Sequence, residues 1–460
     1  MKYKLIKLLA LTSLIFTGCK NKENNSQNEP QEEEPQTEVV EDLTPDFEID
    51  VTLCDTSDMI TDKSVYDVKL NYTDKYFKYT ASTFKKDLML LSFGAANSMT
   101  EKETGQKFFS DIGFTNLYAS PEYDTGGTET SAQYIIAKKQ IDDFTVFAVS
   151  FKSHLYGDEW ANNLTLGESG NHAGFMATGT KVYNNLLNYI SGHNNFKLWI
   201  SGYSRGGGLS NVLSHIVMSN PSLGINETNL YTYTFAGTRC LTKENAKPYK
   251  NIFNLYNSAD ILANFAPEGY GMYRCGTDID IFDEHVDEYL PSFSPEFNLG
   301  EFKPSKGSYK NDKEFTKYFL NELLSESSSY DKEKYPYDLC SREHYYEVQT
   351  PVTYLLTHFL SMADYLTVFT EEFKDITSSE VISYLSDDGT KLTEKVKELF
   401  DKYDVIYEDD ALAESCRVAA LLAKRYLSVI LECVSNSNAA RMIGMHYAET
   451  NYILIQRVSL

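Results

Sequence analysis

KLWISGYSRGGGLSNVL, residues 197–213, is the stretch that decides how this 460-residue chain folds. An apolar run typical of a strand leads into Gly-x-Ser-x-Gly, and apolar residues at helical spacing follow at once. A serine on such a sharp strand-to-helix turn exposes its hydroxyl beside the first backbone N–H groups of the helix. The context therefore favours a nucleophilic Ser204 over a chance occurrence of the motif.

Strand and helix patterns alternate around this turn. Apolar, β-branched runs predict strands at 133–138, 144–151, 197–201, 231–236 and 252–256, and the first two form the pattern of a hairpin. A helix is predicted at 175–190; upstream, strand structure is predicted within 64–80 and helices at 84–96 and 102–112. We therefore expect residues 49–290 to form an α/β core, with a mainly parallel sheet covered on both faces and an N-terminal strand and helix extension.

The character of the chain changes after residue 290. Residues 291–313 are rich in Pro, Ser, Gly and Lys, which predicts a loop, and the pattern is then helical to about residue 434. We expect 291–434 to be a helical insertion that caps the active edge of the sheet, because lids and insertions often lie there. The alternative is a separate helical domain without a part in catalysis. Residues 435–460 would return the chain to the core.

The first residues indicate where the protein works. Residues 1–19 combine a lysine-rich start with an apolar run that is too short to span a bilayer, as in the core of a secretory signal. Thr17-Gly18-Cys19 resembles the cleavage box of bacterial lipoproteins, in which the cysteine becomes the lipid-bearing N-terminus. We expect an exported protein that is anchored through Cys19 to the bacterial cell membrane or outer membrane. The alternative is an ordinary secretory signal.

An acidic segment follows the signal. Residues 20–48 have few large apolar side chains and are strongly acidic, which predicts a disordered, extended tether. They contribute to a formal net charge of −24 for the chain. This charge argues against a nucleic-acid partner, because phosphate contacts need basic patches.

The remaining cysteines point to no metal site. Six follow Cys19, and no pair has the Cys-x-x-Cys spacing of metal ligands. We expect mostly buried thiols, with one or two disulfide bridges as the alternative, and we expect neither a metal nor a cofactor.

A serine nucleophile needs a base within hydrogen-bond reach and an acid that orients the base. Asp260 follows the strand predicted at 252–256, where such an acid lies on hydrolase sheets; the alternative is that Asp260 only caps a turn. The candidate bases downstream are His446, then His344, then His285. His358, on an apolar helix face, and His172, ahead of the serine, are interpreted as structural.

Three further segments resemble the class 3 (fungal-lipase-like) lipases, α/β-hydrolases that cleave carboxylic esters. They are NHAGF at 171–175, YTFAGTR at 233–239 and NSADIL at 257–262, the last followed by Phe265-Ala266-Pro267. The resemblance covers roughly 134–285 and leaves the helical block unexplained. It implies a triad of Ser204, Asp260 and a histidine, and the His446 segment resembles the family's terminal His-x-x-x-x-x-Tyr element.

One element departs from the family pattern. Such lipases have Arg-Gly-Thr/Ser after an early strand, and its backbone supplies one N–H of the oxyanion hole. Lys152-Ser153 occupies that place here, so the hole would use the N–H of Arg205 and one from Ser153 or His154. A serine in place of the glycine changes the backbone freedom of the loop, and losing one donor costs about 10²–10³ in rate.

The residues together predict an exported serine hydrolase, a lipase or esterase that acts on acyl esters or lipids through an acyl-enzyme. Two alternatives remain. One is a weak or inactive surface lipoprotein that keeps the scaffold for binding. The other is a hydrolase of thioesters or amides, because the same triad serves those bonds.

Overall fold

A seven-stranded sheet forms the centre of the protein in the computed structural model, which describes residues 42–54, 65–126, 130–153, 159–293, 299–304, 309–325, 335–362, 377–435 and 438–458. The strands lie in the order β11 (Thr277–Asp280), β9 (Ile252–Tyr256), β7 (Leu230–Phe235), β6 (Phe196–Tyr203), β5 (Phe144–Phe151), β4 (Tyr134–Ile141) and β3 (Thr115–Ala119). From β5 to β11 neighbouring strands are parallel, whereas β4 is antiparallel to both of its neighbours. The predicted hairpin is therefore confirmed as β4–β5.

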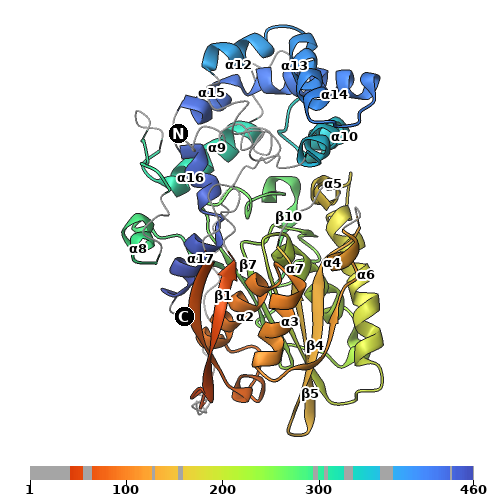
Figure 1. The fold of residues 1–460 in the computed structure, drawn as a ribbon, viewed down its shortest axis with the longest axis vertical. Helices are drawn as coiled ribbons and strands as arrows, with labels where there is room; N and C mark the ends of the chain where they lie inside the picture. Colours follow the sequence, from red (N-terminus) through yellow and green to blue (C-terminus); the bar gives the residue numbers. More distant parts are fainter. Residues whose placement is uncertain are drawn as a thin grey trace.

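Helices cover both faces of this sheet (Figure 1). One face carries α2 (Lys86–Ser98) and α3 (Lys102–Asp111), and the other carries α6 (Ala173–Ile190) and α7 (Arg205–Met218). Strand β6 shows why both faces are apolar: Trp199 packs with the α2 side, whereas Leu198 and Ile200 pack with the α7 side. Successive side chains of a strand alternate between faces, so a strand covered on both faces is apolar throughout.

Small elements complete the core. They are a ribbon of β1 (Phe47–Cys54) and β2 (Val65–Tyr72), a pair of β8 (Leu241–Thr242) and β10 (Met272–Tyr273), the short helices α4 (Glu122–Thr125) and α5 (Glu159–Leu164), and the 3₁₀ turns η2 (Asp74–Phe77), η3 (Pro221–Leu223) and η4 (Glu268–Tyr270). The strand predicted within 64–80 thus ends at Tyr72.

The helical block begins near residue 286. It contains α8 (Val286–Phe293), α9 (Asp312–Leu324), α10 (Arg342–Leu360), α12 (Ser378–Tyr384), α13 (Thr390–Lys402), α14 (Asp409–Arg425), α15 (Leu427–Ser435), α16 (Asn438–Gly444) and α17 (Ala448–Ile455). Figure 1 shows α10 and α12 to α15 at one end of the molecule, beyond α5 and β10, while α17 descends beside the sheet. Ile261 and Tyr270 of the core share one apolar cluster with Phe315 and Tyr345 of the block. The block is therefore packed onto the loops at the carboxyl edge of the sheet.

The N-terminal boundary differs from the prediction. Strand β1 begins at Phe47, inside the segment predicted as a tether at 20–48, and Asp42 already forms an ion pair with Lys75 at 2.8 Å. Pairing with β2 orders this end, because Phe47 lies opposite Tyr72 and the two rings are in contact. Residues 1–41, with the predicted signal and Cys19, lie outside the described residues. Within the described part of the chain, every helix is too short or too polar to cross a bilayer.

Candidate active site

Ser204 occupies the turn between β6 and α7. Its backbone has φ 54° and ψ −121°, a conformation that L-residues rarely adopt and that is typical of strained functional turns. The turn is held on the sheet, because the Ser204 N–H donates to the carbonyl of Phe235 at 2.8 Å. The side chain of Ser204 is half-buried and so remains reachable from solvent.

Two glycines make this turn sterically allowed. A Cβ on Gly202 would lie 2.1 Å from the carbonyl oxygen of Gly206, inside the turn itself. A Cβ on Gly207 would lie 2.8 Å from the carbonyl oxygen of Phe235 and 2.9 Å from the Cα of Gly237. Both contacts are with backbone, which cannot rotate away, so α7 can start this close to the sheet only because these positions lack a side chain.

His446 joins Ser204 to Asp260. Its Nε2 lies 2.7 Å from Ser204 Oγ, and its Nδ1 lies 2.7 Å from Asp260 Oδ2. Asp260 is fully buried and His446 nearly so. The structure therefore brings together the three residues that were predicted to carry the chemistry, with the favoured histidine at the centre.

The second oxygen of Asp260 is also occupied. Oδ1 accepts hydrogen bonds from the backbone N–H groups of Leu262, at 2.8 Å, and Ala263, at 3.2 Å. Asp260 thus caps the turn after β9 and also contacts His446. The cap fixes the orientation of the carboxylate towards the imidazole.

Two polar residues that sequence reasoning missed hold the backbone of His446. The hydroxyl of Tyr203 donates to the carbonyl of His446, and the Nδ2 of Asn451 donates to Tyr203 Oη at 3.2 Å and to the carbonyl of Met445 at 3.0 Å. Burial, together with the nearby carboxylates of Asp260 and Glu449, raises the pKa of Tyr203, which keeps its hydroxyl protonated as a donor. The position of Tyr203 directly before Ser204 was the only available signal.

The other candidate histidines have different partners. His344 Nδ1 contacts Asp338 and Cys340, and the exposed His285 contacts Glu288. His358 stacks on Tyr354, with ring centroids 4.0 Å apart. His172 is fully buried against the carbonyl of Asn163, and burial lowers its pKa to about 3. These contacts favour His446 among the five.

The candidate oxyanion hole lies at the first turn of α7. Arg205 is the first helical residue, and its buried guanidinium donates to Asn163 Oδ1 at 2.9 Å and to the carbonyl of Ser131 at 2.8 Å. A Cβ on Gly206 would lie 3.0 Å from the carbonyl oxygen of Lys152, so the chain leading to the buried Ser153 runs beside the serine turn. His154, the alternative donor, lies outside the described residues.

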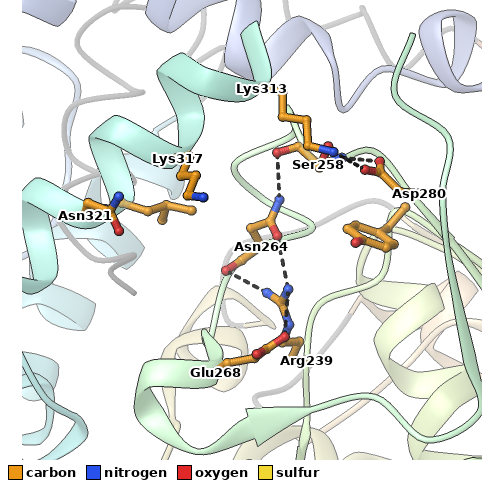
Figure 2. A pocket seen from close by; sticks show the side chains of 10 residues that line it. Arg239, Ser258, Asn264, Glu268, Asp280, Lys313, Lys317 and Asn321 are labelled. Carbon is orange, nitrogen blue, oxygen red and sulfur yellow. Dashed lines mark hydrogen bonds and ion pairs between the residues drawn. The ribbon is translucent and has the colours of Figure 1, made fainter. Parts of the chain in front are cut away.

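A pocket of about 290 Å³ lies beside the loop that carries Asp260, because Ser258 and Asn264 line it. Figure 2 shows it between α9, with Lys313, Lys317 and Asn321, and the core residues Arg239, Asn264 and Glu268. Asn264 connects the pocket to the site, because its Nδ2 donates to the carbonyl of Asp260 at 2.7 Å. Five of the ten lining residues are charged: Arg239, Glu268, Asp280, Lys313 and Lys317.

Residues 136–270 match the family described as Lipase (class 3). Solved structures with some likeness include a triacylglycerol lipase whose catalytic centre is a serine protease triad (16% identity, 44% of this chain and 83% of that one, TM-score 0.34) and a fungal lipase–inhibitor complex (15%, 46% and 83%, TM-score 0.36). A lipase from Rhizopus microsporus var. chinensis gives 15% identity, 45% and 75% coverage and a TM-score of 0.32. No curated protein matches the chain. Residues 136–270 of this chain therefore match the class 3 lipases, and the mainly parallel sheet with a serine at its strand-to-helix turn agrees with a serine ester hydrolase of the α/β-hydrolase type.

Proposed function

We propose that this lipase hydrolyses acyl esters through a triad of Ser204, His446 and Asp260. The observation that carries the proposal is the imidazole of His446, which uses its two nitrogens for the two partners at 2.7 Å each. Only this arrangement lets one ring take a proton from the serine while a carboxylate holds the other nitrogen protonated.

The chemistry follows from these positions. Ser204 Oγ attacks the acyl carbonyl as His446 Nε2 takes the hydroxyl proton, and the tetrahedral intermediate expels the alcohol, which receives that proton. The acyl-enzyme is then hydrolysed by a water that His446 deprotonates in the same way. Asp260 stabilises the imidazolium that forms in both steps. The backbone N–H groups of Arg205 and Ser153 would stabilise the oxyanion.

We also propose that the helical block roofs the acyl site. An apolar cluster of Leu164, Leu356 and Leu360, with Phe265 against it, joins the core loops to α10. The phenol of Tyr345 on α10 donates to the carbonyl of Leu164 at 2.8 Å. These contacts support a block that stays with the core beside the serine turn.

Export and anchoring through Cys19 are a further part of the proposal, supported by the signal-like residues 1–19. Metabolic labelling with a radioactive fatty acid should mark the wild type, and Cys19→Ser should lose both the label and sedimentation with membranes. Persistent membrane association of an unlabelled Cys19→Ser protein would contradict the lipid anchor.

The catalytic proposal is tested with a fluorophosphonate probe, which should label the wild type and leave Ser204→Ala unlabelled. Short-chain ester turnover should be lost in His446→Ala and retained in His285→Ala, the matched control, because His285 is exposed and contacts Glu288. Thioester and amide substrates with the same acyl group identify the preferred bond. A folded wild type that neither takes the probe nor turns over any of the three substrates would favour the non-catalytic binding scaffold.

A further inference from the structure

A second cluster of reactive side chains lies in the helical block, at the start of α10. Asp338, Cys340 and His344 place a carboxylate oxygen, the thiol sulfur and an imidazole nitrogen all within 4.8 Å of one another. Cys340 Sγ lies 3.1 Å from His344 Nδ1, and the same nitrogen contacts Asp338 Oδ1. We propose that these three residues bind a divalent transition-metal ion of the Zn²⁺ class.

The geometry of this cluster differs from that of the candidate catalytic triad at Ser204. In the site at Ser204, His446 contacts its two partners through two different nitrogens, so one nitrogen can take the serine proton while the other stays protonated against Asp260. At His344 the sulfur and the carboxylate oxygen both face Nδ1. A single Nδ1 cannot at once accept the thiol proton and present the N–H that a carboxylate orients, whereas three donor atoms this close together can share one metal ion.

The donor set selects the metal. Thiolate, imidazole and carboxylate are the three ligand types of protein-bound zinc, whereas calcium and magnesium prefer oxygen alone. Binding deprotonates the thiol of Cys340, and that proton leaves to solvent as the sulfur–metal bond forms. Three protein donors leave one tetrahedral position for water. The His344 side chain is 30% exposed, so the ion can enter from solvent.

The cluster lies where the helical block is fastened to the core. Arg342, between Cys340 and His344, donates to the carbonyls of Leu166, Gly167 and Gly170 at 2.9, 2.8 and 2.7 Å. The carbonyl of Leu339 accepts a hydrogen bond from the core phenol of Tyr270 at 2.8 Å. A metal at this position would lock the segment that makes these contacts, so its role is structural and its loss would loosen the block from the core.

The cysteine spacing in the sequence predicted no metal, because that reasoning looked for pairs of cysteines. The Asp-x-Cys-x-x-x-His pattern at 338–344 supplies one ligand of each type and lacks such a pair. The structure supplies the missing information, since the first turn of α10 brings His344 back over Cys340.

The test uses the purified full chain in detergent, stripped with a chelator and titrated with Zn²⁺ against a chromophoric competitor. The wild type should bind one equivalent. Cys340→Ser and His344→Gln should each weaken binding by at least about tenfold, since even outer-shell substitutions cost 10–100-fold. Zn²⁺ should raise the melting temperature of the wild type and leave that of the two variants unchanged. His285→Gln is the matched control, because His285 also has carboxylate neighbours but no sulfur.

Cobalt gives a readout that does not depend on activity. Co²⁺ should produce sulfur-to-metal charge-transfer absorption in the wild type and not in Cys340→Ser. If the variants do not fold, the wild type alone suffices, because Zn²⁺ should protect Cys340 from alkylation in a peptide map. Three outcomes would each overturn the proposal. The absorption band could be absent, or Zn²⁺ could fail to slow the alkylation of Cys340. The wild type and a folded Cys340→Ser could also bind Zn²⁺ with equal affinity.

Discussion

Replacing Asp260 by asparagine should nearly abolish activity without unfolding the protein. The N–H groups of Leu262 and Ala263 both point at Oδ1 and require an acceptor there. The asparagine must therefore turn its carbonyl oxygen to them and its NH₂ towards His446 Nδ1. That nitrogen then has to accept a hydrogen bond, so the ring proton moves to Nε2. The imidazole now presents a donor to Ser204 and cannot take its proton.

The magnitude follows from the loss of the correct tautomer. Such a change in a Ser-His-Asp triad lowers kcat by about 10⁴, or about 5.5 kcal/mol in the activation barrier. The assay is kcat and KM on a short-chain chromogenic ester, with thermal unfolding to show that Asp260→Asn is folded.

Asp280→Asn is the matched control for this prediction. Asp280 Oδ1 accepts from the N–H of Ser258 at 3.0 Å, so this carboxylate braces the same loop without contacting His446. It should lose far less activity than Asp260→Asn. A folded Asp260→Asn that lost only about tenfold in place of 10⁴ would refute the reasoning, and so would an equal loss in Asp280→Asn.

Three other substitutions test the packing of the serine turn, a buried ion pair and a buried histidine. Gly207→Ala should destabilise the protein by about 1–3 kcal/mol in urea unfolding, because its Cβ would press on the backbone of β7; an unchanged midpoint would contradict this. Arg441→Met should cost about 3–5 kcal/mol in the same assay, because it leaves the buried carboxylate of Asp312, 2.6 Å from the guanidinium, without its partner; a neutral result would show that the block does not depend on this pair. Burial lowers the pKa of His172 to about 3, so between that pH and about 6.5 unfolding takes up a proton and stability falls on acidification by about 1.4 kcal/mol per pH unit. His172→Gln should flatten this slope and the exposed His285→Gln should not, and equal slopes in the two variants would reject the assignment.

Much of the core could be predicted from local patterns. Strand β5 is buried along its whole length and α6 shows a clear helical period, and both were found close to their observed bounds. Strand β11 was not found, because Thr277–Asp280 is short and lies at the edge of the sheet, with only Ile279 buried. Such a strand is defined by its neighbour β9 and carries no periodic signal of its own.

The residues of the candidate site also differ in how far the sequence could predict them. Ser204 could be predicted because its turn is encoded within five residues, and Asp260 because it follows a strand. His446 could only be ranked among alternatives, since its contact with Ser204 spans 242 residues. The support from Tyr203 and Asn451 could not be predicted, because a hydrogen bond across 248 residues leaves no trace in either local pattern. The cluster at Asp338 is local, yet it mixes three residue types and matches no pair spacing.

The long sequence separation between Ser204 and His446 also determines when, during protein synthesis, the serine can contact the histidine. At synthesis rates of about 5–20 residues per second, the sequence separation of 242 residues between Ser204 and His446 takes about 10–50 s to make. For most of that interval a nascent chain contains both Ser204 and Asp260, but it lacks the imidazole that lies between them in the folded protein. On the proposed mechanism, Ser204 therefore acquires its base only when the helical block has been synthesised and the segment of α16 and α17 that carries His446 has docked. On the proposed mechanism, a chain that is stalled or misfolded in that block lacks its base and cannot hydrolyse esters.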